Sequence, residues 1–139
     1  MNVLLVDDAS DVRFLLRARL SRRYPALRYS EADSGLTASI QLSQGHFDLV
    51  ISDSEMSNGS GFWLYHFMRK NFPTVPLIIF TGDPRGFRAS VDQTLKAIIA
   101  KGNMQGLLSE IDKWNHGNCE GLRSRLLSSS CMRWPPPEF

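Results

Sequence analysis

The chain has 139 residues, a length typical of one domain, and 42% of them are hydrophobic, which is enough for a single core. Its 16 basic and 14 acidic residues give a net charge of +2. So small an excess does not indicate binding to nucleic acid or to a membrane surface. We therefore expect one domain that makes no direct contact with nucleic acid or membrane and that works through a specific site.

The N-terminus and the cysteines favour a cytoplasmic location. The opening segment, MNVLLVDD, has only four consecutive apolar residues and no basic flank, so it does not resemble a signal peptide. No other stretch approaches the apolar length of a membrane span. Cys119 and Cys131 both lie near the C-terminus, where a disulfide would staple only the tail. We expect both to be free thiols in a reducing compartment.

The first two expected strands are each followed by an expected helix. Residues 3–6 form a continuous apolar run that predicts a strand, and Ser10 is placed to cap the helix that follows. The core face of that helix is expected to carry Val12, Leu15, Leu16 and Leu20. A weaker strand is expected near residues 27–30. The next helix runs from about Leu36 to Gln44, where Gly45 terminates it.

The middle of the chain repeats the pattern. Residues 48–52, DLVIS, predict a third strand, and Gly59 and Gly61 mark the loop after it. The helix that follows stops before Pro73. Its expected core face carries Leu64, Phe67, Met68 and Phe72. Residues 76–80, PLIIF, predict the fourth strand.

The last unit begins with a poorly periodic stretch from Arg85 to Thr94, which is expected to hold only a short helix. Residues 97–100, AIIA, predict the fifth strand. The clearest amphipathic helix follows, with an apolar face made of Met104, Leu107, Leu108, Ile111 and Trp114. Continuous apolar strands that alternate with helices predict an α/β fold, a doubly wound five-stranded parallel sheet with helices on both faces.

Five polar residues stand at the ends of these apolar strands: Asp7, Asp8, Asp53, Thr81 and Lys101. Because ligands bind at the carboxyl ends of the strands in an open α/β sheet, these side chains are expected to meet at one edge of the fold. The carboxylate of Asp53, which directly follows the buried-looking strand DLVIS, is therefore expected to belong to a site.

This ordered set resembles the receiver domain of two-component response regulators, of the chemotaxis-regulator type, over about residues 2–114. The resemblance implies the flavodoxin-like receiver fold. It further implies a receiver domain over residues 1–114 and a C-terminal tail or linker over residues 115–139. No single element carries the resemblance, since a lone pair of aspartates or a lone Lys-Gly is common. The set in this order, on alternating strands and helices, is specific.

The resemblance implies a role for each residue of the set. Asp7 and Asp8 are expected to hold Mg²⁺, and Asp53 is expected to take a phosphoryl group from a histidine. Thr81 is expected to bind a phosphoryl oxygen, and Lys101 to pair with the acceptor or its phosphate. These residue types suit the chemistry, because a carboxylate can attack a phosphoryl group only where cations offset the repulsion.

Oxygen ligands also suit Mg²⁺, which binds one or two carboxylates and keeps several waters. Asp53 and, by resemblance, the backbone carbonyl of Glu55 are expected to complete the metal site. Glu55 and Asp83 lie two residues beyond Asp53 and Thr81, at positions that in the family modulate phosphate gain and loss. As many as five carboxylates are then expected to crowd one end of the sheet, unless these two point into water.

Three positions depart from the family pattern. Gly102 follows Lys101 where the family usually has a proline on a cis bond, and Ser57 replaces another usual proline. Ile98 stands where the family has a Tyr or Phe whose rotation reports phosphorylation. An aliphatic side chain cannot make that rotation, so we expect the response to lie in the segment from Gly82 to Thr94.

The preferred interpretation is a receiver domain that accepts a phosphoryl group on Asp53 and acts as a phosphorylation-dependent switch. It is expected to be a signalling domain, with at most slow self-dephosphorylation. One alternative is a degenerate receiver that binds partners without phosphorylation. The other is a phosphatase of the haloacid dehalogenase type, which would place the nucleophile on the first strand and the metal acids late, contrary to the order found here.

The expected partners are a histidine kinase or a histidine phosphotransfer protein, and a downstream protein target or a missing output domain. The segment from His116 onward is too short to form an output domain of its own. Its serine and proline runs indicate a flexible or extended conformation. We therefore expect a linker or a partner-binding extension at this end.

Overall fold

The computed structural model of the chain describes residues 1–87 and 89–117. Five parallel strands form one sheet in the order β2-β1-β3-β4-β5. The strands are β1 (Asn2–Val6), β2 (Arg28–Ala32), β3 (Leu49–Ser52), β4 (Leu77–Thr81) and β5 (Leu95–Ala100). The helices are α1 (Ser10–Arg23), α2 (Gly35–Gln44), α3 (Gly61–Asn71) and α4 (Met104–Asp112). A 3-10 turn, η1 (Pro84–Gly86), precedes β5, and a π-helical turn, η2 (Lys113–Gly117), follows α4.

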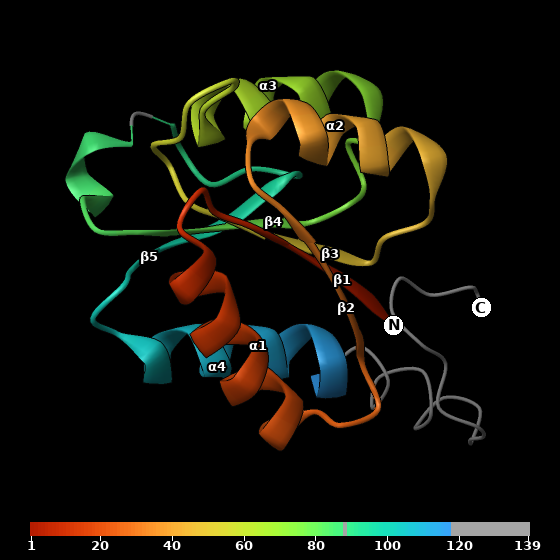
Figure 1. The fold of residues 1–139 in the computed structure, drawn as a ribbon, viewed down its shortest axis with the longest axis vertical. Helices are drawn as coiled ribbons and strands as arrows, with labels where there is room; N and C mark the ends of the chain where they lie inside the picture. The colour runs from red at the N-terminus through yellow and green to blue at the C-terminus, as the bar shows by residue number, and fades with distance from the viewer. Residues whose placement is uncertain (88, 118–139) are drawn as a thin grey trace.

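The helices cover the two faces of the sheet in pairs, with α2 and α3 on one face and α1 and α4 on the other (Figure 1). The strand order explains this division. The chain moves one way along the sheet from β1 to β2 and then the other way to β3, β4 and β5. Right-handed crossovers in opposite directions place their helices on opposite faces. This confirms the predicted doubly wound parallel sheet.

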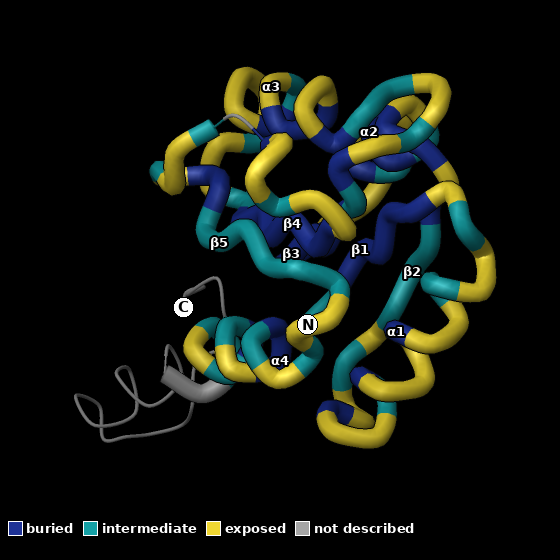
Figure 2. Tube along the Cα trace, turned by 90° about the vertical axis from the view of Figure 1, so that its left-hand side faces the viewer, coloured by how far each residue is buried: buried dark blue, intermediate teal, exposed yellow. Residues whose placement is uncertain are grey.

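The strands are apolar throughout because both of their faces are covered. In β1, Val3 and Leu5 pack toward α1 and α4, whereas Leu4 and Val6 pack toward α2 and α3. Figure 2 shows β1, β3 and β4 buried between the two helical layers. The predicted strands and helices are found with ends shifted by one or two residues, apart from two corrections described next. None of the helices within residues 1–87 and 89–117 combines the length and apolarity that a membrane crossing requires.

The first correction concerns α1. Ala9 occupies the N-cap position and Ser10 is the first helical residue, so the predicted capping role of Ser10 is wrong. Leu16 and Leu20 are buried as expected, but Leu15 is 60% exposed. Only a narrow face of α1 packs against the sheet. Leu16 lies on that face, and Leu15, the preceding residue, points away from it. Leu15 and the neighbouring, more exposed Phe14 thus form an apolar surface patch on α1.

The second correction concerns the connection from β4 to β5, which was expected to hold a short helix between Arg85 and Thr94. Among its described residues, the only helical turn is η1, which covers Pro84–Gly86. Proline fits the first turn of a helix but glycine disfavours its continuation. The first part of the segment is held instead by the ring of Phe87. Phe87 is buried against Phe62 and Tyr65 of α3, with ring centroids 5.8 and 6.3 Å away.

The far end of this connection is fixed by the carboxylate of Asp92. Its Oδ1 accepts hydrogen bonds from the backbone N–H groups of Thr94 and Leu95, both at 2.8 Å. Its Oδ2 accepts a hydrogen bond from the Tyr65 hydroxyl of α3. Burial by itself raises the pKa of Asp92, but the hydrogen bonds from Tyr65, Leu95 and Thr94 outweigh burial and hold the pKa below its ordinary value. One carboxylate thus ties the start of β5 to α3.

We expect Asp92→Ala to lower the free energy of unfolding by roughly 1–3 kcal/mol at pH 7, because it leaves two backbone donors without their acceptor. A carboxyl with a lowered pKa stabilises the fold above its unfolded pKa of about 3.9, and that stabilisation is lost as the pH falls through the lower native value. The difference between wild type and variant should therefore shrink below about pH 4. Urea unfolding from pH 7 to pH 3 measures it. A difference that stays constant over this range would contradict the assignment.

Candidate functional site

The candidate site is formed where four strands end. Asp7 and Asp8 follow β1, Asp53 follows β3, Thr81 ends β4, and Lys101 follows β5. Pairing of the parallel strands aligns these ends. The Asp53 N–H donates to the Val6 carbonyl at 2.9 Å, and the Lys101 N–H donates to the Thr81 carbonyl at 2.8 Å. The sheet therefore brings five residues that are far apart in the sequence to one edge.

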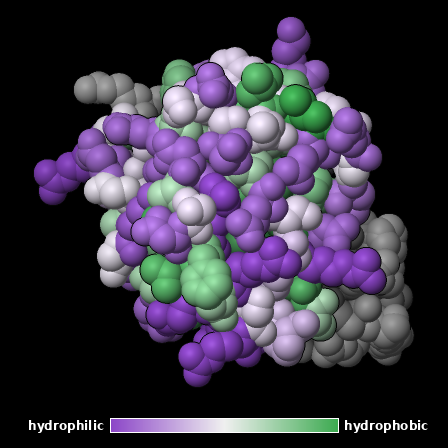
Figure 3. Space-filling model, in the orientation of Figure 1, coloured by the Kyte–Doolittle hydropathy of each residue, from purple (hydrophilic) through white to green (hydrophobic). Residues whose placement is uncertain are grey.

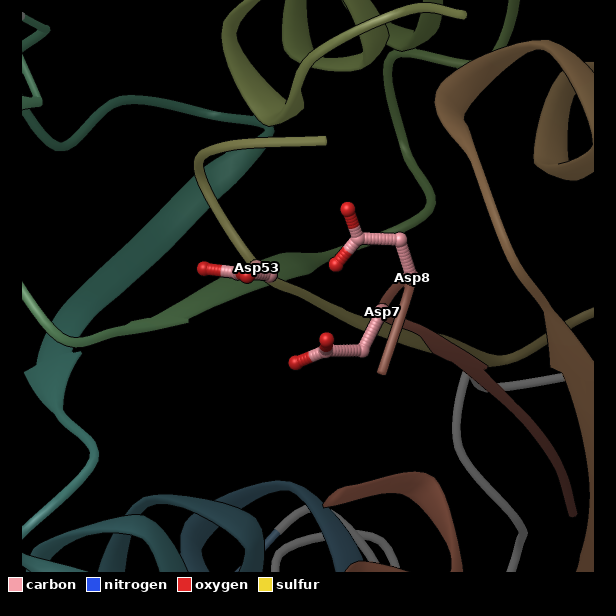
Figure 4. Close-up of side chains that lie close together, drawn as sticks. All are labelled: Asp7, Asp8 and Asp53. Carbon is pink, nitrogen blue, oxygen red and sulfur yellow. The ribbon is translucent and has the colours of Figure 1, made fainter. Parts of the chain in front are cut away.

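Three of these residues form a cluster of carboxylates. One oxygen each from Asp7, Asp8 and Asp53 can be chosen so that all three lie within 4.8 Å of one another. Figure 4 shows the three side chains entering the same space from the ends of β1 and β3. Asp7 is buried, Asp8 is exposed and Asp53 lies between these extremes. The cluster is thus buried on the side of Asp7 and open to solvent on the side of Asp8.

The ammonium group of Lys101 lies against the buried side of this cluster. Its Nζ is 2.9 Å from Asp7 Oδ2 and 3.2 Å from Asp53 Oδ2. Burial by itself lowers the pKa of Lys101, but the hydrogen bond and charge of Asp7, reinforced by those of Asp53, outweigh burial and raise the pKa. Lys101 therefore stays charged at neutral pH and offsets part of the negative charge of the cluster.

Backbone N–H groups hold two of the three acidic side chains, those of Asp7 and Asp53, in place. Asp7 Oδ1 accepts a hydrogen bond from the Ala9 N–H at 2.9 Å, just before α1 begins. Asp53 Oδ1 accepts one from the Ser54 N–H at 2.7 Å. Gly61, the first residue of α3, packs so closely that a Cβ there would lie 2.2 Å from the Asp53 carbonyl oxygen. Only glycine allows α3 to begin this close to the acidic cluster.

A pair of hydroxyl groups lies beside Asp53. The Ser54 and Thr81 oxygens, Oγ and Oγ1, are 2.6 Å apart and both residues are buried. The Asp83 N–H also donates to Thr81 Oγ1, at 3.1 Å. Sequence reasoning identified Thr81 but missed Ser54. The serine is visible next to Asp53 in the sequence, but its pairing with a residue 27 positions away follows from the sheet alone.

Glu55 and Asp83 do not join the cluster. Both are exposed, and among the described residues the acidic group that can hold a metal consists of Asp7, Asp8 and Asp53. Asp83 Oδ1 instead accepts a hydrogen bond from the Gly86 N–H at 3.3 Å and so caps η1. The expected crowding is therefore limited to three carboxylates. Ile98 is half-buried on β5, packed against the core beneath α3.

The arrangement suits a divalent cation and a phosphoryl group together. Mg²⁺ prefers carboxylate oxygens and retains several waters, and the open side at Asp8 leaves space for both. A phosphoryl group next to Asp53 would meet the Lys101 ammonium on one side and the Thr81 hydroxyl on another. A positive charge on one side and a hydrogen-bond donor on the other suit the transfer of a phosphoryl group to a carboxylate.

Comparison with known proteins identifies the relatives of this chain. A family model described as the response regulator receiver domain matches residues 3–111. The chain is 32% identical over 87 residues to chemotaxis protein CheY-3 of Vibrio cholerae, a match covering 61% of this chain and 66% of that protein. It is 30% identical over 99 residues to chemotaxis protein CheY of Pseudomonas aeruginosa, covering 70% of this chain and 75% of that protein.

A longer relative matches only in part. The DNA-binding transcriptional regulator NtrC of Proteus hauseri is 30% identical over 80 residues, which cover 58% of this chain and 16% of that protein. Two solved structures resemble the fold closely. The response regulator TrrA of Thermotoga maritima, in complex with Mg²⁺-BeF, has a TM-score of 0.71 at 25% identity, covering 81% of this chain and 96% of TrrA. A chain in the complex of histidine kinase ThkA with TrrA has a TM-score of 0.69 at 26% identity, and the match covers 81% of this chain and 96% of that chain.

We expect Lys101→Met to lower the free energy of unfolding at pH 7 by about 1–3 kcal/mol, less than for a fully buried ion pair, because the lysine side chain is 29% exposed. Its raised pKa means that the stabilisation is complete below the unfolded lysine pKa of about 10.4 and is lost as the pH rises through the native value. The gap between wild type and variant should therefore close at strongly alkaline pH.

Lys113→Met is the matched control. Lys113 pairs with Glu110 three residues away and its side chain is 70% exposed, so its loss should cost no more than about 0.5 kcal/mol. Urea unfolding of both variants between pH 7 and pH 11 makes the comparison. Equal losses in the two variants would show that Lys101 is an ordinary surface lysine.

Proposed function

Since the chain belongs to the family of response regulator receiver domains, we propose that it is a phosphorylation switch in two-component signalling. In this proposal Asp53 accepts a phosphoryl group from a histidine kinase or a histidine phosphotransfer protein. The observation that supports it best is the placement of Asp53 Oδ2, 3.2 Å from Lys101 Nζ and within the carboxylate cluster. An acceptor carboxylate needs such a neighbouring cation to meet an anionic phosphoryl group.

The residues of the site take separate roles in the proposal. Asp7, Asp8 and Asp53, with the backbone carbonyl of Glu55, hold Mg²⁺. The ion, when bound, supplies positive charge to the phosphoryl oxygens. Lys101 supplies a second positive charge beside Asp53, fixed by its contact with Asp7. The chain itself thus positions the acceptor and offsets its charge.

The transfer is a substitution at phosphorus. An oxygen of the Asp53 carboxylate forms a bond to phosphorus while the P–N bond of a phosphohistidine breaks, and the imidazole nitrogen keeps the electron pair of that bond. Three phosphoryl oxygens remain, carrying dispersed negative charge. The Thr81 hydroxyl donates a hydrogen bond to one of them and Lys101 pairs with another. Glu55 and Asp83, which are both exposed, are proposed to modulate how fast the phosphoryl group is lost.

The proposed phosphoryl donor is a protein, and α1 offers a surface for it. Exposed Phe14 and Leu15 form an apolar patch there, which Figure 3 shows as green atoms over α1 on a largely hydrophilic face. A hollow of about 180 Å³ continues from Leu15 to Lys101 and is otherwise lined by apolar residues of α1, β4 and α4. This continuity from an apolar patch to the site suits a protein donor better than a small molecule. The complex of ThkA with TrrA is an example of a kinase bound to a similar regulator.

The proposal assigns residues 1–114 to the receiver domain and residues 115–139 to a tail or linker toward a protein target or an output domain. The predicted tail beyond residue 117, with both cysteines, lies outside the described residues.

Ile98 cannot act as a rotating ring, so the segment from Gly82 to Thr94 is proposed to change on phosphorylation. It is held by one ring, one capped turn and the Asp92 carboxylate rather than by a helix, and segments with few contacts open most easily.

The first prediction tests the acceptor. Incubation with acetyl phosphate and Mg²⁺ should add one phosphoryl group to the wild-type chain, detected by intact-mass spectrometry, and Asp53→Asn should add none. Asp11→Asn, which removes an exposed carboxylate of α1 outside the cluster, should label like wild type. Labelling that persists in Asp53→Asn would assign the acceptor elsewhere. A wild-type chain that never labels would favour the degenerate receiver.

The second prediction tests the metal. A ligand that binds only the native state adds RT ln(1 + [L]/Kd) to its stability, about 2.7 kcal/mol at a hundredfold excess over Kd. Mg²⁺ should therefore raise the melting temperature of the wild-type chain. Asp8→Asn should raise the metal-free stability by about 0.5 kcal/mol, because one repelling charge is gone, and should lose most of the Mg²⁺ gain.

Thermal melts of wild type, Asp8→Asn and Asp11→Asn across a Mg²⁺ series provide the measurement. Asp11→Asn should keep the full Mg²⁺ gain. An unchanged Mg²⁺ response in Asp8→Asn would remove Asp8 from the metal site.

A further inference from the structure

The contact between the Ser54 side chain and Thr81 has no role in the acceptor chemistry described above. Its hydroxyl oxygen lies 2.6 Å from Thr81 Oγ1, and the two residues are 9% and 2% exposed. The backbone N–H of the same serine donates to Asp53 Oδ1 at 2.7 Å. Ser54 therefore contacts the proposed acceptor through its backbone and the proposed phosphate-binding hydroxyl through its side chain.

The backbone of each of these two residues is held by a hydrogen bond to a neighbouring element. The Ser54 carbonyl accepts a hydrogen bond from the Gly61 N–H at 2.9 Å, which ties the serine to the start of α3. The Thr81 carbonyl accepts one from the Lys101 N–H at 2.8 Å, which ties the threonine to β5. With both backbones held, the directions of the two hydroxyl protons decide which oxygen donates and which accepts.

The numbers of protons and lone pairs on the Thr81 hydroxyl determine which way the two hydroxyl protons must point. A threonine hydroxyl has one proton to donate and two lone pairs to accept with. At Thr81 one lone pair accepts from the Asp83 N–H at 3.1 Å. If Ser54 donates to the second lone pair, the Thr81 proton is left to donate to an oxygen on Asp53. If Thr81 donates to Ser54 instead, that proton is used and an anionic oxygen receives nothing from Thr81.

We propose that Ser54 is a positioning residue that directs the Thr81 hydroxyl proton toward the phosphoryl group on Asp53. This inference rests on the proposed function. Ser54 donates to Thr81 and Thr81 donates to the phosphoryl oxygen, so that each of the two hydroxyl protons has an acceptor. A chain of hydrogen bonds that ends on an anion strengthens each member. The serine acts on the phosphoryl group only through Thr81.

The test uses beryllofluoride, a phosphoryl mimic, together with Mg²⁺. Ser54→Ala should bind beryllofluoride about 3–10-fold more weakly than wild type, the loss expected for one hydrogen bond. It should bind Mg²⁺ with unchanged affinity, because the serine side chain is not a metal ligand. Calorimetric titration of each ligand gives both values, and the half-life of the phosphorylated form should shorten in parallel.

Two further variants separate positioning from simple packing. Ser54→Thr keeps the hydroxyl, and its added methyl can enter a hollow of about 240 Å³ lined by Ser54, Phe62 and Phe87, so it should restore wild-type binding. In a Thr81→Ala background, Ser54→Ala should have no further effect on beryllofluoride affinity, because the serine has lost the residue through which it acts. Ser57→Ala, in the same loop but exposed, is the control and should bind like wild type.

The outcomes that overturn the inference are distinct. Equal beryllofluoride affinity of Ser54→Ala and wild type would remove the serine from the site. An equal loss in the Thr81→Ala background would show that Ser54 acts by packing and not through Thr81. A wild-type chain that binds no beryllofluoride with Mg²⁺ present would overturn the proposed function, and this inference with it.

Discussion

The site depends on the ammonium group of Lys101. Three carboxylates converge at the site, and this ammonium group contacts two of them. Asp7 and Asp53 each lie within 3.2 Å of it. The carboxylates themselves, with oxygens within 4.8 Å of one another, repel strongly in a partly buried environment. By pairing with two of the three, Lys101 lets the ends of β1 and β3 stay together in the absence of metal. It also stands where a phosphoryl group on Asp53 would need a positive neighbour.

Much of this site follows from the sequence, since the sheet is parallel. Apolar runs identify the strands, the polar residue after each run lies at its carboxyl end, and parallel strands bring those ends to one edge. This reasoning was sufficient to name five residues as neighbours: Asp7, Asp8, Asp53, Thr81 and Lys101. It was not sufficient for Ser54, because a hydroxyl next to an acceptor is uninformative until its partner is known. The direction in which Glu55 and Asp83 point was equally undetermined, since both lie in loops.

The exposure of Leu15 and the unexpected form of the β4–β5 connection have the same physical origin. Sequence periodicity reports which residues are apolar, but tertiary packing decides which apolar residues are covered. Leu15 lies within an apolar helical pattern and is nevertheless exposed beside Lys101. The connection from β4 to β5 has a weak pattern, and in it a buried ring, Phe87, packs against α3 where a short helix was expected. Both departures lie next to the site, where exposed apolar groups and loosely held segments are useful for binding and switching.

The affinity for Mg²⁺ of the wild-type chain and of Lys101→Met, measured by calorimetric titration, tests the role of this lysine most directly. If Lys101 offsets the charge of the carboxylates, its removal leaves them without a competing cation, and Mg²⁺ should bind several-fold more tightly. Beryllofluoride, which needs the ammonium as a partner, should at the same time bind poorly or not at all. Equal or weaker Mg²⁺ binding by the variant would contradict the account, because it would mean that Lys101 does not neutralise the cluster.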